Sequence, residues 1–286
     1  MDASSQNPAD FRSGGAVCVR PPAALTGLTR GWVGYREHLA STVRRQEIPT
    51  STVLLVVAFG DPVSVGRAGD EGRGRAFTFL VVGPRDRTVV LGGRGDQHGV
   101  LVRLDPLDAY SLLGFPLGLV SNDVTDLESL LGRPGGRLVE RLAEERSWRR
   151  RFAVLADTLA RLITAGPVPD PAVVLAWRRL RDTAGGIRIA TLGDQLGLSR
   201  RHLVRRFHQQ IGLPPKTVAR IFRFEHALTL MGADLPSMAD VAAAAGYSDQ
   251  AHLSREARAL VHCAPSEIAA MRGRALAGGM SHLFKP

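Results

Sequence analysis

Apolar and polar positions follow two different patterns along this chain. In the first hundred residues, short runs of β-branched and apolar residues alternate with glycine-rich turns. The clearest run covers residues 52–59, between Pro49 and the turn Gly60-Asp61-Pro62. Runs of this length and composition are typical of buried strands. Further strands are expected at residues 76–82, 87–91 and 99–104.

After these strands the apolar spacing becomes helical. Asp105-Pro106 opens a predicted helix that reaches Leu113, and two more helices are expected at residues 136–145 and 147–164. The last helix carries one apolar stripe: Trp148, Phe152, Leu155, Leu159 and Leu162. Such a stripe packs inside its own domain or forms a dimer seam, and the first interpretation is favoured. Strands followed by helices predict an α+β N-terminal domain with a small sheet or barrel.

A proline-rich segment divides the chain. Residues 165–171, Ala-Gly-Pro-Val-Pro-Asp-Pro, combine three prolines and a glycine, which disfavours any regular element. Asp170 is suited to cap the next helix, with Pro171 in its first position. The expected organisation is a disordered lead-in (1–15), an effector-binding or dimerisation domain (16–165), a linker (166–171), a DNA-binding domain (172–273) and a tail (274–286).

The C-terminal region contains a duplication. Residues 192–199 align with residues 241–248 at a constant offset, and His202–Arg205 then aligns with His252–Arg255 after a one-residue insertion. In each copy a helix of small apolar residues leads to a Gly, an apolar residue and a Ser. Gly supplies the positive φ that ends a helix, and Ser is a favoured N-cap for the next one. Both copies therefore predict a helix-turn-helix unit.

The remaining elements complete an all-α C-terminal domain. The first unit is expected to consist of helices at about 189–196 and 200–210. Pro214-Pro215 precedes a linker helix that extends to Met231 and spans about 22 Å at 1.5 Å per residue. Together with the width of the flanking units, this length brings the two recognition helices close to the separation of successive major grooves, about 34 Å. Ser237 restarts the chain for the second unit, and Pro265-Ser266-Glu267 opens a last short helix.

Charge follows the same division. Residues 170–286 contain 16 Lys and Arg against 9 Asp and Glu, and the first 169 residues contain 21 against 18. Most of the net charge of +10 therefore lies on the helical region, as expected for a polyanionic partner. One predicted helix alone carries Arg200, Arg201, His202, Arg205, Arg206 and His208.

Other functions lack their sequence signatures. Cys18 and Cys263 are too few for a disulfide framework, and no His, Cys or carboxylate spacing predicts a metal site. The glycine-rich stretches 69–74 and 92–96 lack the context of a phosphate loop and are interpreted as loops. We predict no cofactor, no metal and no enzyme activity. With no apolar run of membrane-spanning length and no apolar signal segment, a cytoplasmic location is expected.

The C-terminal motifs resemble the AraC/XylS family of bacterial transcriptional regulators. The matching stretches are Leu198–Phe207 and Ile211–Pro215 in the first unit, and Val241-Ala242, Gly246–Arg255 and Pro265–Glu267 in the second. The resemblance covers residues 172–273. Two positions depart from it: Ala257 stands where the family has Phe, and His262 where it has Gly. These departures suggest a looser or differently docked second unit.

The resemblance also implies which residues contact DNA. Base-edge contacts would come from Arg201, Val204 and Arg205, and from Gln250, Ala251, His252 and Arg255. Asp249 is interpreted as a helix cap. The complete candidate set is Ser199, Arg200, Arg201, His202, Val204, Arg205 and Arg206 in the first recognition helix, and Ser248, Gln250, Ala251, His252 and Arg255 in the second.

Two functional hypotheses follow. The first is a sequence-specific transcription regulator of double-stranded DNA, modulated by a small effector or by dimerisation through the N-terminal half. RNA polymerase and a second copy of the chain are further candidate partners. The alternative is an effector-independent architectural DNA-binding protein. The contrast between an Arg-rich and a Gln/His-containing recognition helix favours the first, because an unspecific basic clamp needs no such asymmetry.

Overall fold

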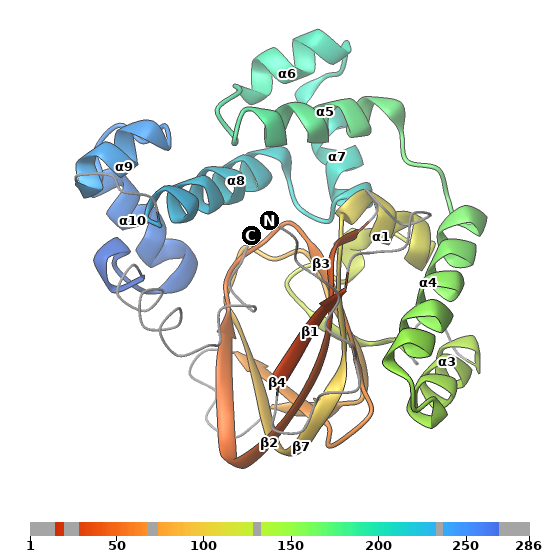
Figure 1. Ribbon diagram of the computed structural model, residues 1–286. Coiled ribbons are helices and arrows are strands. Elements are labelled where there is room, and N and C mark those ends of the chain that lie inside the picture. Colours follow the sequence, from red (N-terminus) through yellow and green to blue (C-terminus); the bar gives the residue numbers. More distant parts are fainter. Residues whose placement is uncertain (1–14, 20–28, 68–73, 128–132, 233–236, 269–286) are drawn as a thin grey trace, which may run out of the picture.

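The computed structural model describes residues 15–19, 29–67, 74–127, 133–232 and 237–268 (Figure 1). A curled antiparallel sheet forms the N-terminal part, helices α3 and α4 cover one side of it, and helices α5 to α10 lie across one end (Figure 1). An α+β domain followed by an all-α region was the predicted fold class, and it is confirmed. The expected lead-in and tail fall outside the described residues, apart from Gly15 at the start of the first strand.

The sheet has eight strands. They are β1 (Gly15–Val19), β2 (Thr29–Glu47), β3 (Val53–Ala58), β4 (Val63–Arg67), β5 (Arg75–Phe77), β6 (Phe79–Val82), β7 (Val89–Leu104) and β8 (Val124–Asp126). The order is β1-β2-β7-β3-β6-β8, and β4 pairs with β5 and with β7. The long strands β2 and β7 pair along almost their whole length, with register shifts that help the sheet to curl.

Strand β3 is the predicted buried strand, and all six of its residues are buried. Val53, Leu55 and Val57 belong to a core that includes α1 and α4. Leu54 and Val56 face the opposite side, inside the curl of the sheet. Covering on both faces explains why this strand reads as a continuous apolar run rather than an alternating one.

One interpretation of the glycine-rich segments was wrong. Residues 89–91 of the first predicted strand (87–91) and the whole of the second (99–104) are parts of the single strand β7, so residues 92–96 lie in a strand and not in a loop. Gly92 pairs with Ser64 of β4, and a Cβ at Gly92 would lie 2.3 Å from the Ser64 Oγ. A Cβ at Gly92 would have to displace the Ser64 hydroxyl, so glycine suits the close approach of this neighbouring strand. The other stretch, 69–74, lies outside the described residues except for Gly74.

Four helical segments accompany the sheet: α1 (Pro106–Leu113), the short η2 (Leu117–Leu119), α3 (Arg133–Glu144) and α4 (Trp148–Ala165). The apolar stripe of α4 packs into the core of its own domain, where Phe152, Leu155 and Leu159 are buried together with Trp32 of β2. The intradomain interpretation of this stripe is confirmed.

The C-terminal helices match their predicted bounds closely. They are α5 (Pro171–Asp182), α6 (Ile189–Leu196), α7 (Arg200–Gln210), α8 (Pro215–Leu230), α9 (Met238–Ala244) and α10 (Gln250–Val261). A further helix starts at Pro265, as expected. The Asp170 side chain accepts from the Ala172 amide at 2.8 Å, and the Asp170 amide donates to the Gln210 Oε1 at 2.9 Å. Asp170 and Pro171 thus belong to this helical region rather than to the linker.

Candidate DNA-binding interface

The first helix-turn-helix unit consists of α6 and α7. Gly197 ends α6 in the left-handed conformation (φ 63°), and a Cβ there would meet no atom within 4 Å, so the backbone alone requires glycine. The Ser199 Oγ accepts from the His202 amide at 3.3 Å and caps α7. These observations confirm the predicted end of α6 and the predicted start of α7.

Helix α7 has an inner and an outer face. Leu203 and Phe207 are fully buried in a core shared with α5 and the first half of α8. On the opposite side four of the candidate residues are exposed: Arg200, Arg201, Val204 and Arg205. With three exposed guanidinium groups around one exposed valine, α7 is equipped to donate hydrogen bonds and to make one apolar contact.

Two other candidates of α7 are engaged within the fold. Arg206 forms an ion pair with Asp170, and its Nε donates to the His202 Nε2 at 3.1 Å. Asp170 also caps α5, so the ion pair connects the middle of α7 to the start of α5. This pairing competes with any contact of Arg206 to a phosphate.

The second unit, α9 and α10, repeats the arrangement with two differences. Gly246 has a φ of 79° and is separated from α9 by Ala245, whereas Gly197 follows α6 directly. The cap of α10 is Asp249, whose Oδ1 accepts from the His252 amide at 2.6 Å. This bond holds the pKa of Asp249 below its usual range. The interpretation of Asp249 as a helix cap is confirmed. The expectation that Ser248 caps this helix is wrong, because the one-residue insertion moves the cap to the next position.

His252 is held by two neighbouring side chains at the start of α10. The Tyr247 ring meets the His252 ring edge-on at 5.2 Å between centroids, and the Ser248 Oγ lies 3.1 Å from the His252 Nδ1. His252 is therefore half-buried, while Gln250, Ala251 and Arg255 are exposed on the outer face of α10. The two recognition helices thus expose different chemistry: mostly guanidinium on α7, and amide, methyl and guanidinium on α10.

The two positions that depart from the family pattern have clear structural consequences. Ala257 is fully buried against Phe224 and Leu228 of α8, so aromatic bulk in this core comes from α8 instead of α10. His262 adopts the left-handed conformation at the end of α10, with a φ of 59°. The expectation that His262 occupies a position suited to Gly is therefore confirmed. The Arg220 Nε also donates to the Glu256 Oε1 at 2.6 Å and ties α10 to α8.

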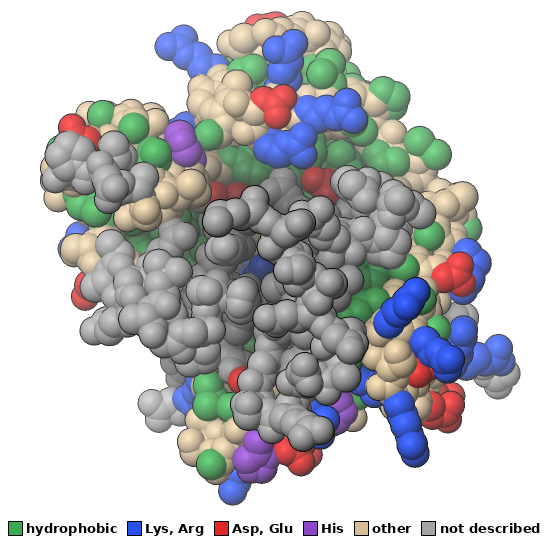
Figure 2. Space-filling view, in the orientation of Figure 1, with side chains coloured by type: hydrophobic (Ala, Val, Ile, Leu, Met, Phe, Trp, Pro, Cys, Tyr) green, Lys and Arg blue, Asp and Glu red, His purple; other side chains and the backbone are tan. Residues whose placement is uncertain are grey.

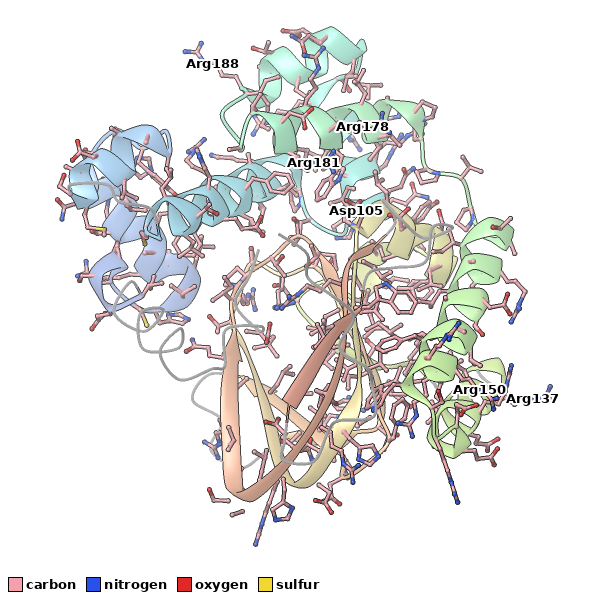
Figure 3. The ribbon with its side chains drawn as sticks, viewed as in Figure 1. Asp105, Arg137, Arg150, Arg178, Arg181 and Arg188 are labelled. Atoms are coloured by element: carbon pink, nitrogen blue, oxygen red, sulfur yellow. The ribbon has the colours of Figure 1, made fainter. Side chains whose placement is uncertain are left out.

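Three exposed arginines near the first recognition helix were not singled out from the sequence. Arg188 immediately precedes α6, and Arg178 and Arg181 lie on α5 (Figure 3). In the space-filling view, basic side chains gather over these helices (Figure 2). The signal was available, since an arginine at the start of the first helix of such a unit lies where DNA phosphates approach a helix N-terminus.

Among the described residues, no group of three His, Cys, Asp or Glu side chains is arranged to hold a metal ion. In the part of the chain that the structure describes, no helix is both long enough and apolar enough to cross a bilayer.

Comparison with known proteins identifies the C-terminal region. A family profile described as "Helix-turn-helix domain" matches residues 192–271, which contain the last five residues of α6 and all of α7 to α10. No curated protein sequence matches the chain.

Solved structures similar to this chain include ToxT from Vibrio cholerae, with 11% identity, 91% of this chain and 99% of that chain covered, and a TM-score of 0.47. The xylose-binding transcription activator XylR shows 21% identity over 43% of this chain and 39% of that chain, with a TM-score of 0.33. The AraC-like transcriptional activator CuxR shows 17% identity over 68% of this chain and 80% of that chain, with a TM-score of 0.22. All three likenesses are weak, and the helix-turn-helix match is what identifies the region.

Proposed function

We propose that this chain, whose C-terminal region belongs to the AraC type of helix-turn-helix domains, is a transcription regulator that reads a specific DNA site with two recognition helices. One observation carries the proposal. Each of α7 and α10 begins at a capped N-terminus, buries one face and exposes a face of candidate base-reading side chains. The N-terminal end of a recognition helix is the part that reaches base edges in the major groove.

For the first helix, we assign base contacts to Arg201, Val204 and Arg205. An arginine can hold the O6 and N7 of guanine with two hydrogen bonds, and an exposed valine suits the methyl group of thymine. Ser199 and Arg200, at the helix start, are assigned to the DNA backbone. Arg188 at the start of α6 joins them as a phosphate contact.

Arg206 and His202 receive a supporting role in this proposal. Their mutual hydrogen bond and the ion pair with Asp170 fix α7 against α5, which orients the base-reading side chains. A contact of either residue with DNA would use only its remaining donors.

For the second helix, we assign base contacts to Gln250, Ala251, His252 and Arg255. A glutamine suits the N6 and N7 of adenine, and a methyl group suits thymine. Tyr247 and Ser248 fix the His252 ring, so this side chain would present a set orientation to the groove. Ser248 itself lies beside the helix start and is assigned to the backbone.

The N-terminal α+β domain is the proposed regulatory part. We assign to residues 16–165 the binding of a small effector or of a second copy of the chain, and to the whole protein a contact with RNA polymerase at its promoters. The division into this domain and a DNA-binding part, residues 170–273, is supported by the proline-rich segment between α4 and α5. The protein would act by binding and not by catalysis.

An architectural role is the second candidate, and a single measurement separates the two. The full-length protein is titrated at one fixed salt concentration against its best site, selected from random DNA, and against unrelated DNA of equal length. A specific regulator is expected to bind its site at least about 10³-fold more tightly. A ratio near one would replace the regulator with a sequence-tolerant architectural protein.

A further inference from the structure

The N-terminal domain touches both helix-turn-helix units, at two separate places. The first seam joins α1 and η2 to the first unit. At this seam the Trp177 Nε1 of α5 donates to the Asp105 Oδ2 at 3.0 Å, and the Ser121 Oγ donates to the carbonyl of Gly212 at 2.6 Å. Leu107 of α1 lies in the same apolar core as Trp177. The first unit therefore shares part of its core with the N-terminal domain (Figure 1).

The first seam is closely packed. A Cβ at Gly118 of η2 would lie 2.1 Å from the Cε1 of His208 in α7, and a Cβ at Gly212 would lie 2.5 Å from the Ser121 Oγ. Asp105 also caps α1 through its other oxygen, so both carboxylate oxygens are used. Opening a seam with a shared core and paired polar groups costs much free energy, because packing and hydrogen bonds are lost together.

The second seam joins the sheet to the second unit and is built differently. The Thr50 Oγ1 donates to the Glu225 Oε1 of α8 at 3.2 Å, and the Thr88 Oγ1 donates to the carbonyl of Leu260 in α10 at 3.2 Å. Ile48 is the partly buried apolar residue that packs here against the core of α8 and α10. Two threonine hydrogen bonds and the packing of Ile48 thus join the sheet to the second unit.

Buried polar groups beside the second seam are incompletely paired. Arg85 exposes 2% of its surface and exchanges backbone hydrogen bonds with Thr50, while its Nη2 lies 3.5 Å from the Glu47 Oε2. Its Nε and Nη1 have no hydrogen-bond partner, and neither do the Ser51 Oγ and one oxygen of Asp86. Burial lowers the pKa of Arg85. The charge of Glu225 on α8 also acts on Arg85 across this seam. Any water admitted to the unpaired groups when the seam opens would offset part of the lost contacts.

The helix that joins the two units has a matching division. Val218 and Phe222 in the first half of α8 belong to the core of the first unit. Ala227 and Leu228 in its second half belong to the cores of the second unit. Arg223, at the junction, donates to the carbonyl of Gly185 at 3.0 Å, and its guanidinium lies 5.7 Å from the centre of the Tyr247 ring. Any change in the separation of the recognition helices must occur around this junction or by movement of the second unit on α8.

We propose that the second seam, through Thr50, Arg85 and Thr88, sets the separation of the two recognition helices and hence the spacing between half-sites that the protein accepts. The first unit stays fixed to the N-terminal domain, and the second unit is the adjustable one. These N-terminal residues determine specificity without being among the proposed DNA contacts. The inference rests on the proposed function, because it requires two recognition helices on one DNA site.

A series of DNA sites tests this role. The best site for the full-length protein is remade with one base pair removed, or with one or two base pairs inserted, between its two halves, and equilibrium affinity is measured at fixed salt. Thr50→Val combined with Thr88→Val removes both threonine donors of the second seam. This variant is expected to keep the wild-type affinity within about threefold at the original spacing. Its penalty at altered spacings is expected to be at least about tenfold smaller than that of the wild type.

Two matched variants complete the design. Thr158→Val removes a similar threonine on α4, whose Oγ1 donates to the carbonyl of Val154, and is expected to reproduce the wild-type spacing profile. Arg85→Met combined with Glu47→Leu replaces the incompletely paired ions with apolar groups and is expected to sharpen the profile. It gives a second test if the threonine variant is unstable.

The outcomes are distinct. A wild-type protein that prefers its site but tolerates every spacing would overturn the inference and leave the proposed function intact. Spacing profiles of the threonine and arginine variants that coincide with the wild type would also overturn it. A wild-type protein with no preference for its site would instead contradict the proposed function itself.

Discussion

The C-terminal end of α10 offers a direct test of the backbone argument. His262 has a φ of 59° and is exposed, and its amide donates to the carbonyl of Arg258 at 3.1 Å. Glycine at this position keeps that hydrogen bond and removes the steric conflict of a Cβ. The left-handed conformation costs a residue with a side chain about 1–2 kcal/mol. Glycine also gives the unfolded chain more conformational freedom, which favours unfolding by about 0.4–1 kcal/mol.

His262→Gly is therefore expected to stabilise the second unit by about 0.5–1 kcal/mol, the difference between these two effects. Amide hydrogen exchange of α9 and α10 in the full-length protein measures this locally, and exchange should slow by about two- to fivefold. Gly246→Ala is the opposite control, because Gly246 has a φ of 79° and a Cβ there would meet no atom within 4 Å. Exchange should accelerate in that variant. If His262→Gly leaves exchange unchanged or faster while Gly246→Ala accelerates it, the reasoning from φ is refuted at this site.

Three further predictions follow from individual contacts. Arg205→Ala should weaken binding to the specific site by about 1–3 kcal/mol and leave the free energy of unfolding unchanged, whereas Arg206→Ala, which loses the pair with Asp170, should lower that free energy by up to about 1 kcal/mol. Urea titrations beside binding curves distinguish them, and equal effects on stability would contradict the assignment. Burial and the neighbouring Asp105 raise the pKa of Asp108 to about 7, above its unfolded value of about 3.9, so the stability gained from its protonation is complete in acid and is lost as the pH rises from about 4 to about 7. Asp108→Asn should flatten this part of the pH profile, and an unchanged profile would show that another group is responsible. Finally, a fragment starting at residue 168 should bind DNA but unfold at lower urea than the full chain, because it lacks the contacts of Asp105 and Leu107 with Trp177, and unchanged stability would mean that the first seam contributes little.

The C-terminal region was predictable because its boundaries are determined locally. Each helix boundary there depends on backbone geometry or on one short hydrogen bond, so the sequence is sufficient to place it. The residues that mark these boundaries are Pro171, Gly197, Ser199, Gly246 and Asp249. The buried strand β3 was equally predictable, because its sequence is a continuous apolar run.

The N-terminal sheet was harder to predict because long-range pairing defines it. Strand β2 carries polar, exposed residues over much of its length and is held by its partner β7, so no local apolar pattern marks it. The glycine-rich part of β7 resembled a loop because Gly92 meets its neighbour, Ser64 of β4, across more than twenty residues of sequence.

The same limit applies to the candidate site. The sequence indicated which residues of α7 are polar but not that Asp170, on another helix, pairs with Arg206. The seams between the domains could not be anticipated either, since Asp105, Thr50 and Thr88 meet their partners across more than seventy residues of sequence.

Guanine protection on the selected DNA site tests the central claim most directly. With two recognition helices in successive major grooves, the full-length protein should protect guanine N7 positions from methylation in two patches. The patches should lie on one face of the DNA, about 10 base pairs apart. Arg201→Ala with Arg205→Ala should remove protection from one patch and preserve the other. Protection confined to one groove, or spread evenly along the DNA, would contradict the account.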